Sequence, residues 1–173
     1  ASVSGEIDIC IVMDTTSSMG SYIAQAKKDS SAIIQKFKSE YSRSSIKFSF
    51  VSFKDHCDQE LLKTFDFDTP ENIEKAIIDV RPSGGGDLPE AVHDGLYAIK
   101  DLSWRQDSTK FVFVIMDAPP HGKEYSDLND KHPDGCPCQI SLTDIVSYYS
   151  VNNISLSLKE CGDGLYRTGK VFG

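Results

Sequence analysis

Three oxygen-bearing side chains follow an apolar run near the start of the chain. Asp14 ends that run, and Thr16 and Ser18 come two and four residues later. A carboxylate and two hydroxyls on a tight loop are ligands that a hard divalent cation such as Mg²⁺ takes in octahedral geometry, with water filling other positions. Because hydroxyls are neutral, the bound ion would still attract a carboxylate from outside. The alternative is a capping loop, since Ser and Thr commonly begin helices.

Two further acidic segments lie at the ends of predicted elements. Asp87 and Glu90 follow three glycines where a helix is predicted to begin, and Asp117 ends the most apolar run of the chain. Acidic residues also favour helix N-termini for electrostatic reasons alone. In α/β proteins, however, ligands bind beyond the carboxyl ends of strands, where all three loops are expected. The sequence therefore predicts one site for Mg²⁺ (or Mn²⁺ or Ca²⁺) made by Asp14, Thr16, Ser18, Asp87, Glu90 and Asp117.

A fourth acidic segment follows the second predicted strand. Asp55 and Asp58 lie just past that strand, which should bring them near the same sheet edge. They are candidates for a second cation site, together with Asp87. The alternative is a solvated turn, a position that Asp favours.

The long polar loop from residue 118 to about 139 contains ligand types for softer metals. The loop contains two histidines and two cysteines, residue types that bind zinc: His121, His132, Cys136 and Cys138. Their spacing matches no standard zinc finger, and the Cys-x-Cys pair is tight for one tetrahedral ion. The favoured interpretation is a variable recognition surface or lid, because binding residues concentrate on loops. In that interpretation His121, Tyr125 and His132 contact a partner.

Hydrophobic periodicity predicts the elements that position these loops. Strands and helices alternate, which predicts an α/β fold with a doubly wound, Rossmann-like and mostly parallel sheet of about six strands, covered by helices on both faces. The connection over residues 54–58 is too short for a crossover, so one edge strand should be antiparallel. The predicted strands are 6–13, 46–53, 61–67, 110–116 and 154–158, and the predicted helices are 22–41, 70–80, 89–100 and 142–150.

Length and charge limit the function classes. A chain of 173 residues suits one domain, with a core over 6–160 and a terminal strand or linker over 161–173. The net charge of −8 disfavours nucleic acid and anionic membranes as partners. No apolar run approaches the roughly 20 residues needed to span a bilayer, and no basic-then-apolar leader opens the sequence. We expect a monomer.

The cysteine pattern predicts reduced thiols. Five cysteines without close, regular spacing are a poor disulfide framework. Cys10 lies inside an apolar run, as expected for a small buried thiol. Reduced thiols favour an intracellular, cytoplasmic setting.

The three acidic loops together resemble those of von Willebrand factor A (vWA) domains. The run Asp14-Thr15-Thr16-Ser17-Ser18-Met19 resembles their DxSxS or DxTxS signature, and Gly84 to Glu90 and Ile115-Met116-Asp117 resemble their second and third metal loops. Phe53 to Asp58, the glycine loop, Trp104-Arg105 and Asp117 to Gly122 also resemble the vWA domain that accompanies the kinase domain in some alpha-type protein kinases. This similarity covers roughly residues 6–160.

The resemblance implies roles for the site residues. Thr16 and Ser18 would bind the ion directly, Asp14 and Asp117 would bind it or hold its waters, and a Glu or Asp of a partner protein would take the sixth position. Many family members carry a Thr in the second loop, whereas this sequence offers Asp87 and Glu90 in a DxPE arrangement that resembles integrin beta-subunit domains. An extra anionic ligand would tighten cation binding but weaken attraction for an outside carboxylate.

The predicted function is a divalent-cation-dependent protein-binding module without catalysis, within a larger intracellular protein such as an alpha-kinase. One alternative is a phosphoryl-transfer enzyme of haloacid dehalogenase type with Asp14 as nucleophile. That chemistry uses a second Asp where Thr16 stands. A flavin- or nucleotide-binding module is disfavoured because Asp14 would repel phosphate and no phosphate-binding Gly-x-x-x-x-Gly-Lys run exists. No His lies in a motif that would pair it with a nucleophile.

Overall fold

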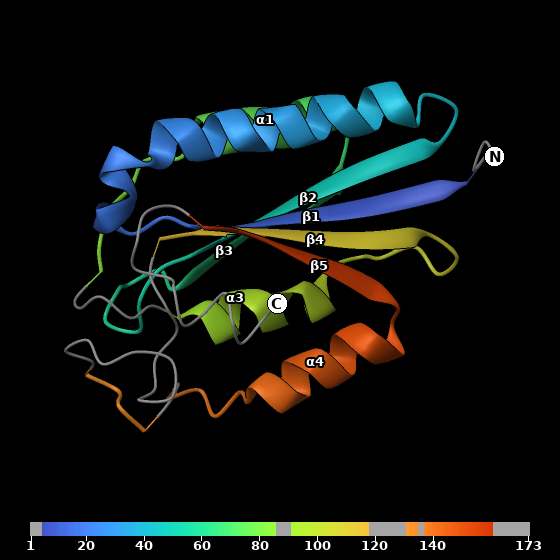
Figure 1. Ribbon diagram of the computed structural model, residues 1–173. Helices are drawn as coiled ribbons and strands as arrows, with labels where there is room; N and C mark the ends of the chain where they lie inside the picture. The colour runs from blue at the N-terminus through green and yellow to red at the C-terminus, as the bar shows by residue number, and fades with distance from the viewer. Residues whose placement is uncertain (1–4, 86–90, 118–130, 135–136, 161–173) are drawn as a thin grey trace.

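A single five-stranded sheet runs through the described part of the chain. The structure, a computed structural model, describes residues 5–85, 91–117, 131–134 and 137–160 (Figure 1). The strand order is β3-β2-β1-β4-β5; β1 pairs in parallel with β2 and β4, β4 pairs in parallel with β5, and β3 is the antiparallel edge strand. The strands are β1 Glu6–Asp14, β2 Ser45–Phe53, β3 Leu62–Asp68, β4 Thr109–Met116 and β5 Ile154–Glu160. The fold class and the antiparallel edge strand are thus confirmed, whereas the expected count of about six strands is one too high for the described residues.

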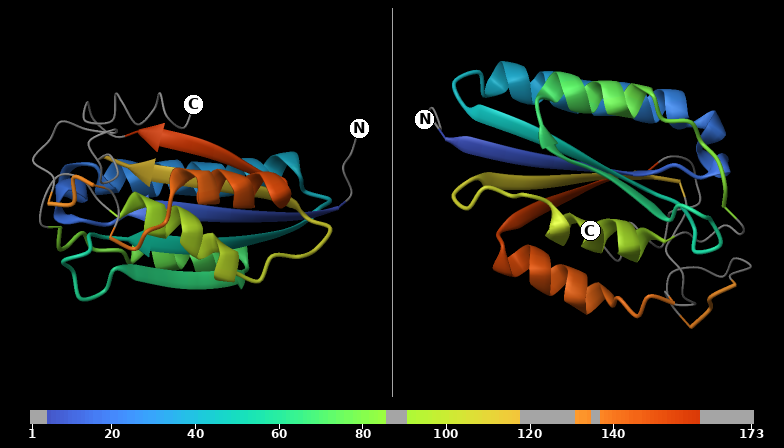
Figure 2. Two further views of the ribbon diagram at one scale, coloured as in Figure 1. Left: turned by 90° about the horizontal axis from the view of Figure 1, so that it is seen from below. Right: turned by 180° about the vertical axis from the view of Figure 1, so that it is seen from behind.

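Helices cover both faces of the sheet (Figure 2). The helices α1 (Ile23–Glu40) and α2 (Pro70–Ile78) lie on one face, and α3 (Val92–Ala98) and α4 (Leu142–Val151) lie on the other. Two short 3₁₀ helices, η1 (Ser17–Ser21) and η2 (Ile99–Asp101), precede α1 and follow α3. The sheet is therefore doubly wound, as predicted.

The central strand β1 explains this two-sided core. Side chains along a strand point alternately to opposite faces. Ile9 and Ile11 join the cluster under α1 and α2, whereas Cys10 and Val12 join the cluster under α3 and α4. All of these side chains are fully buried, which accounts for a nearly continuous apolar sequence where a one-sided strand would alternate.

Local sequence signals account for the helix boundaries. Thr69 caps α2 by accepting a hydrogen bond from the Asn72 amide, with Pro70 in the first turn as predicted. Ser141 and Asp144 form a reciprocal capping box at α4. The helix expected over 89–100 is described from Val92 and changes to the 3₁₀ geometry of η2 at Ile99, and its expected first residues lie outside the described part.

A buried ion pair fixes the amino ends of the central strands. Asp8 is fully buried, and Arg105 donates to it from Nε at 2.8 Å and from its backbone amide at 2.7 Å. The same guanidinium donates to the carbonyls of Ile7 and Ser45, at the starts of β1 and β2. The bidentate geometry of Arg suits this role. This network lies at the opposite end of the sheet from the acidic loops.

Among the described residues, no helix combines the length and the apolar character required to cross a bilayer.

Candidate metal centre

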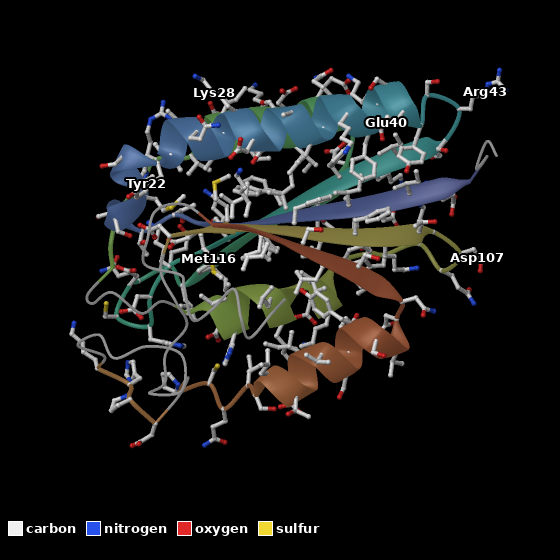
Figure 3. All side chains as sticks on the ribbon, viewed as in Figure 1. Tyr22, Lys28, Glu40, Arg43, Asp107 and Met116 are labelled. Carbon is white, nitrogen blue, oxygen red and sulfur yellow. The ribbon has the colours of Figure 1, made fainter. Side chains whose placement is uncertain are left out.

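The predicted metal loops lie at the carboxyl edge of the sheet. Asp14 ends β1, and Asp117 follows the end of β4, the strand beside it. Figure 3 marks this end of the molecule by Tyr22 and Met116, and the opposite end by Arg43 and Asp107. Neighbouring parallel strands thus bring together two carboxylates that are far apart in sequence.

A chain of hydrogen-bonded oxygens connects the two strands. Asp14 Oδ1 accepts from the Thr16 hydroxyl at 2.6 Å and from the Thr16 amide at 2.9 Å. The Thr16 and Ser18 hydroxyls lie 3.1 Å apart, and Ser18 donates to Asp117 Oδ1 at 3.1 Å. The structure therefore assembles four of the six predicted ligands, Asp14, Thr16, Ser18 and Asp117. Asp87 and Glu90 lie outside the described residues.

The second oxygen of Asp14 is the sharpest feature of the cluster. Asp14 is fully buried, and as a carboxylate its Oδ2 receives no hydrogen bond from a described residue. Burial, followed by a side-chain hydrogen bond that the protonated carboxyl shares with Asp117, raises the pKa of Asp14 to about 8, although the Thr16 hydrogen bonds act in the opposite direction. Buried polar atoms in native proteins nearly always have a partner. An orphaned carboxylate oxygen beside two hydroxyls and a second carboxylate fits a divalent cation.

The glycine loop packs directly on the Asp14 loop. The Ser17 amide donates to the Gly84 carbonyl at 3.1 Å, and the Ser83 amide donates to the Thr15 carbonyl at 3.0 Å. Gly84 and Gly85 have φ values of +78° and +85°, in the left-handed region that favours glycine. The chain therefore runs past the predicted ion site just before Asp87.

Asp58 holds the glycine loop in place. Its Oδ2 accepts from the Gly85 amide at 2.9 Å and from the Asp55 amide at 3.1 Å. A Cβ added to Gly84 would collide with the Asp58 carboxylate. On the far side of the loop, the Ala91 amide donates to the Lys54 carbonyl at 3.2 Å. The turn after β2 thus anchors the backbone on both sides of residues 86–90, a role that the sequence analysis missed.

The second candidate cation site has a different appearance. Asp55 is buried, and its carboxylate accepts from the His56 amide at 2.7 Å and from the Cys57 thiol at 3.2 Å. The hydrogen bond to Asp55 raises the pKa of the Cys57 thiol to about 11. Asp55 and Asp58 do lie in one turn, but Asp58 bonds the glycine loop. The turn interpretation accounts for these contacts, and the second-site prediction stays untested.

The long loop is described only in part. His121, Tyr125 and Cys136 lie outside the described residues, so their predicted roles stay predictions. The His132 ring packs edge-on against His56, with centroids 5.7 Å apart.

The expectation of reduced thiols is wrong at Cys138. Cys138 is disulfide-bonded, whereas Cys10 and Cys57 are free. Spacing along the sequence could not reveal this bond, because pairing depends on which loops meet in three dimensions.

A polar cluster beside the metal loops was not predicted. His56 Nε2 lies 3.1 Å from Asp94 Oδ2, and the Cys138 sulfur lies 3.2 Å from the same oxygen. Because Cys138 is disulfide-bonded, its sulfur carries no proton and this approach is a close contact. The sequence carried no clear signal for this cluster, because Asp94 is two residues from both Val92 and Leu96 and so falls off their apolar face; only the structure shows that it is buried.

The von Willebrand factor A domain model matches residues 8–132. This chain belongs to that family. The vWA resemblance expected from the loops is confirmed, and so is the similarity to an alpha-kinase: the alpha-protein kinase vwkA of Dictyostelium discoideum is 35% identical over 164 residues, 90% of this chain and 26% of the kinase. The chain therefore spans about a quarter of that relative.

Solved vWA-fold structures share the architecture. Proximal thread matrix protein 1 from the mussel byssus, with its MIDAS motif occupied by zinc, matches with a TM-score of 0.62 and 20% identity over 95% of this chain and 38% of that one. The pilus adhesin SpaC of Lactobacillus rhamnosus GG matches with a TM-score of 0.64 and 9% identity over 88% and 24%. At these identities the likeness concerns the fold.

The vWA assignment does not support the haloacid dehalogenase alternative. Thr16 stands where that chemistry needs an acid, and its hydroxyl donates to Asp14, the residue that would be the nucleophile. A hydrogen bond from a neutral hydroxyl stabilises the Asp14 carboxylate. The hydroxyl cannot replace the carboxylic acid that this chemistry uses as its general acid.

Proposed function

We propose that this vWA domain is a divalent-cation-dependent protein-binding module with no catalytic activity of its own. The buried Asp14 carboxylate carries the proposal, because its Oδ1 begins the chain of oxygens through Thr16 and Ser18 to Asp117 while its Oδ2 receives no hydrogen bond from a described residue. These four residues would hold one Mg²⁺ (or Mn²⁺ or Ca²⁺), with Asp87 and Glu90 from the second loop. The ion would supply a positive acceptor at the surface of the sheet edge.

The partner in this proposal is a protein that presents a Glu or Asp carboxylate. Ser18 is exposed and Asp117 is half-buried, so the ion would be reachable from outside. Mussel proximal thread matrix protein 1, whose MIDAS motif holds zinc, and the SpaC adhesin support a metal-dependent adhesive role. If Glu90 completes the shell instead, cation affinity rises and the response to an outside carboxylate weakens. The Glu90→Gln variant distinguishes these cases. If Glu90 completes the shell, the variant should bind the cation less tightly and the partner more strongly.

The experiment is a capture assay in Mg²⁺ and in chelator. Protein retained by the chain in Mg²⁺ and released by chelator supports the proposal. A Thr16→Ala variant that captures the same protein in both conditions would contradict it. Calorimetric titration with Mg²⁺, Mn²⁺, Ca²⁺ and Zn²⁺ identifies the preferred ion, and a second binding event lost in Asp55→Asn would establish the second site.

The surroundings of the domain are part of the same proposal. We place it as one monomeric domain, core 6–160, within a larger intracellular protein such as an alpha-kinase, with no nucleic acid or membrane insertion. The relative vwkA supports the kinase association. The disulfide at Cys138 is the observation against a cytoplasmic setting, because disulfides persist in oxidising compartments. Free thiols are alkylated in intact cells before lysis: modification of Cys138 would indicate a reducing compartment, and a protected Cys138 an oxidising one. Light scattering measures the oligomeric state.

A further inference from the structure

Two side chains from separate segments converge on the carboxylate of a third residue, Asp94, beside the vWA metal loops. His56 comes from the turn after β2, Asp94 from α3 and Cys138 from the segment before α4. Their potential ligand atoms all lie within 4.8 Å of one another. None of the three belongs to the Asp14 cluster, so this group needs its own explanation.

The ligand types are those of a borderline-soft cation. Imidazole, carboxylate and thiolate together are the donor set of zinc sites, whereas Mg²⁺ and Ca²⁺ select oxygen. This set shares only Cys138 with the zinc candidates named from the sequence. His56 and Asp94 take the place of His121, His132 and Cys136. With three ligands from the described residues, a fourth tetrahedral position remains for water or another donor.

The distances fit such an ion after small side-chain rotations. Tetrahedral zinc with bonds of roughly 2.0–2.3 Å keeps its ligand atoms roughly 3.3–3.8 Å apart. The His56 Nε2 to Asp94 Oδ2 distance is 3.1 Å and the Cys138 Sγ to Asp94 Oδ2 distance is 3.2 Å. Asp94 and His56 have side-chain exposures of 8% and 13%. A mostly buried carboxylate and imidazole strengthen binding because little solvent competes.

The oxidation state of Cys138 controls this set. A disulfide sulfur lacks the negative charge that makes a thiolate a metal ligand. We propose that reduction of the Cys138 disulfide creates a zinc-type site made by His56, Asp94 and Cys138. The ion would connect the turn after β2 to α3 and to the segment before α4.

The chemical step balances with a phosphine as reductant. The S–S bond breaks, both sulfurs become thiols, and phosphorus is oxidised to the phosphine oxide with the oxygen of one water. The metal then replaces the proton of the Cys138 thiol, which is released to solvent. A dithiol would supply the same two electrons by thiol–disulfide exchange.

Cobalt(II) tests the site, because a thiolate ligand gives it a charge-transfer absorption in the near ultraviolet that oxygen ligands do not give. The full chain is titrated with Co²⁺ in excess Mg²⁺, which fills the oxygen-lined site, with and without prior phosphine treatment. We expect the reduced chain to develop the band up to one equivalent and the untreated chain to show none. The His56→Ala variant loses one ligand but keeps the thiolate. It should therefore still develop the band, at cobalt concentrations at least about tenfold higher.

Matched cysteine variants assign the sulfur. Cys138→Ser should abolish the band, whereas Cys57→Ser should keep it, since Cys57 is the free, exposed thiol next to His56. A band of equal intensity in Cys138→Ser, or no band in the reduced chain, overturns the proposal, as does its loss in Cys57→Ser. The Mg²⁺-induced rise in melting temperature, measured in each variant, reports the fold and the Asp14 site independently. Failure here therefore leaves the proposed vWA function untouched.

Discussion

Asp14 concentrates the chemistry of the site in one buried oxygen. Its Oδ1 is satisfied by Thr16, and its Oδ2 receives no hydrogen bond from a described residue. A cation bound there would remove the cost of an unsatisfied buried acceptor, which is of the order of 1–3 kcal/mol. Folding stability should therefore depend on the ion.

The Asp14→Asn variant tests that dependence. Asn keeps the shape and the Oδ1 acceptor, so cation-free stability should change by about 1 kcal/mol or less. At Mg²⁺ near 100 times its dissociation constant the parent chain should gain about 2.7 kcal/mol, and the variant should gain nothing. Thermal unfolding with Mg²⁺ and with chelator measures both. Asp79→Asn, at the exposed C-cap of α2, is the control; an equal Mg²⁺ response in Asp14→Asn would remove Asp14 from the site.

At the scale of loops and helices, Asp58 and the glycine loop position the second metal segment. The Asp58 carboxylate occupies the space where a Gly84 side chain would be, and the positive φ of Gly84 excludes most other residues. The positions of Gly84 and Gly85 therefore depend on a turn 27 residues earlier in the sequence, the separation between Asp58 and Gly85.

Gly84→Ala should disturb the site through this contact. We expect a loss of about 1–3 kcal/mol in folding stability from backbone strain, with weaker Mg²⁺ binding by calorimetry. Gly20→Ala is the matched control, since nothing lies within 4 Å of the added Cβ. It should leave Mg²⁺ affinity unchanged. Equal effects of the two substitutions would show that the glycine loop does not position the site.

The Arg105 network belongs to the same scale but to the other end of the strands. Arg105→Ala leaves Asp8 buried without its ion pair, which should cost about 3 kcal/mol or more. Denaturant unfolding measures this loss. Mg²⁺ affinity of the folded variant should stay unchanged, because the network is at the amino edge. The control is Lys100→Ala, which removes an exposed ion pair with Asp101 and should leave the free energy of unfolding unchanged. Equal losses of stability in the two variants would mean that the Arg105 pair contributes no more than a surface pair.

Sequence patterns predicted the elements better than the contacts between them. The buried run of β1 and the short connection after β2 predicted a doubly wound sheet with an antiparallel edge, because periodicity directly reflects burial. The sixth strand has no counterpart in the described residues. The roles of Asp58, His56 and Asp94 depend on loops that meet only after folding, and no spacing rule predicts such meetings. Asp14, Thr16, Ser18 and Asp117 were predictable because strand ends converge in this architecture.

For the whole molecule, the two ends of the sheet should respond as one unit. Trp104, the single tryptophan, packs against Phe67 and donates to the Ile99 carbonyl, far from the acidic loops. If the domain unfolds cooperatively, tryptophan fluorescence and far-ultraviolet circular dichroism should give the same melting temperature. Mg²⁺ should raise both midpoints equally. A fluorescence midpoint that ignores Mg²⁺ would divide the chain into two independent parts.

The order in which the chain is synthesised gives the Ser18–Asp117 contact a further meaning. It joins residues 99 positions apart, and β1 cannot be enclosed until β4 is added beside it. A nascent chain that ends before Asp117 has the first metal loop but not the strand that completes it. Cation binding would therefore favour only chains long enough to have added β4, and the ion would stabilise these chains over chains that end before Asp117.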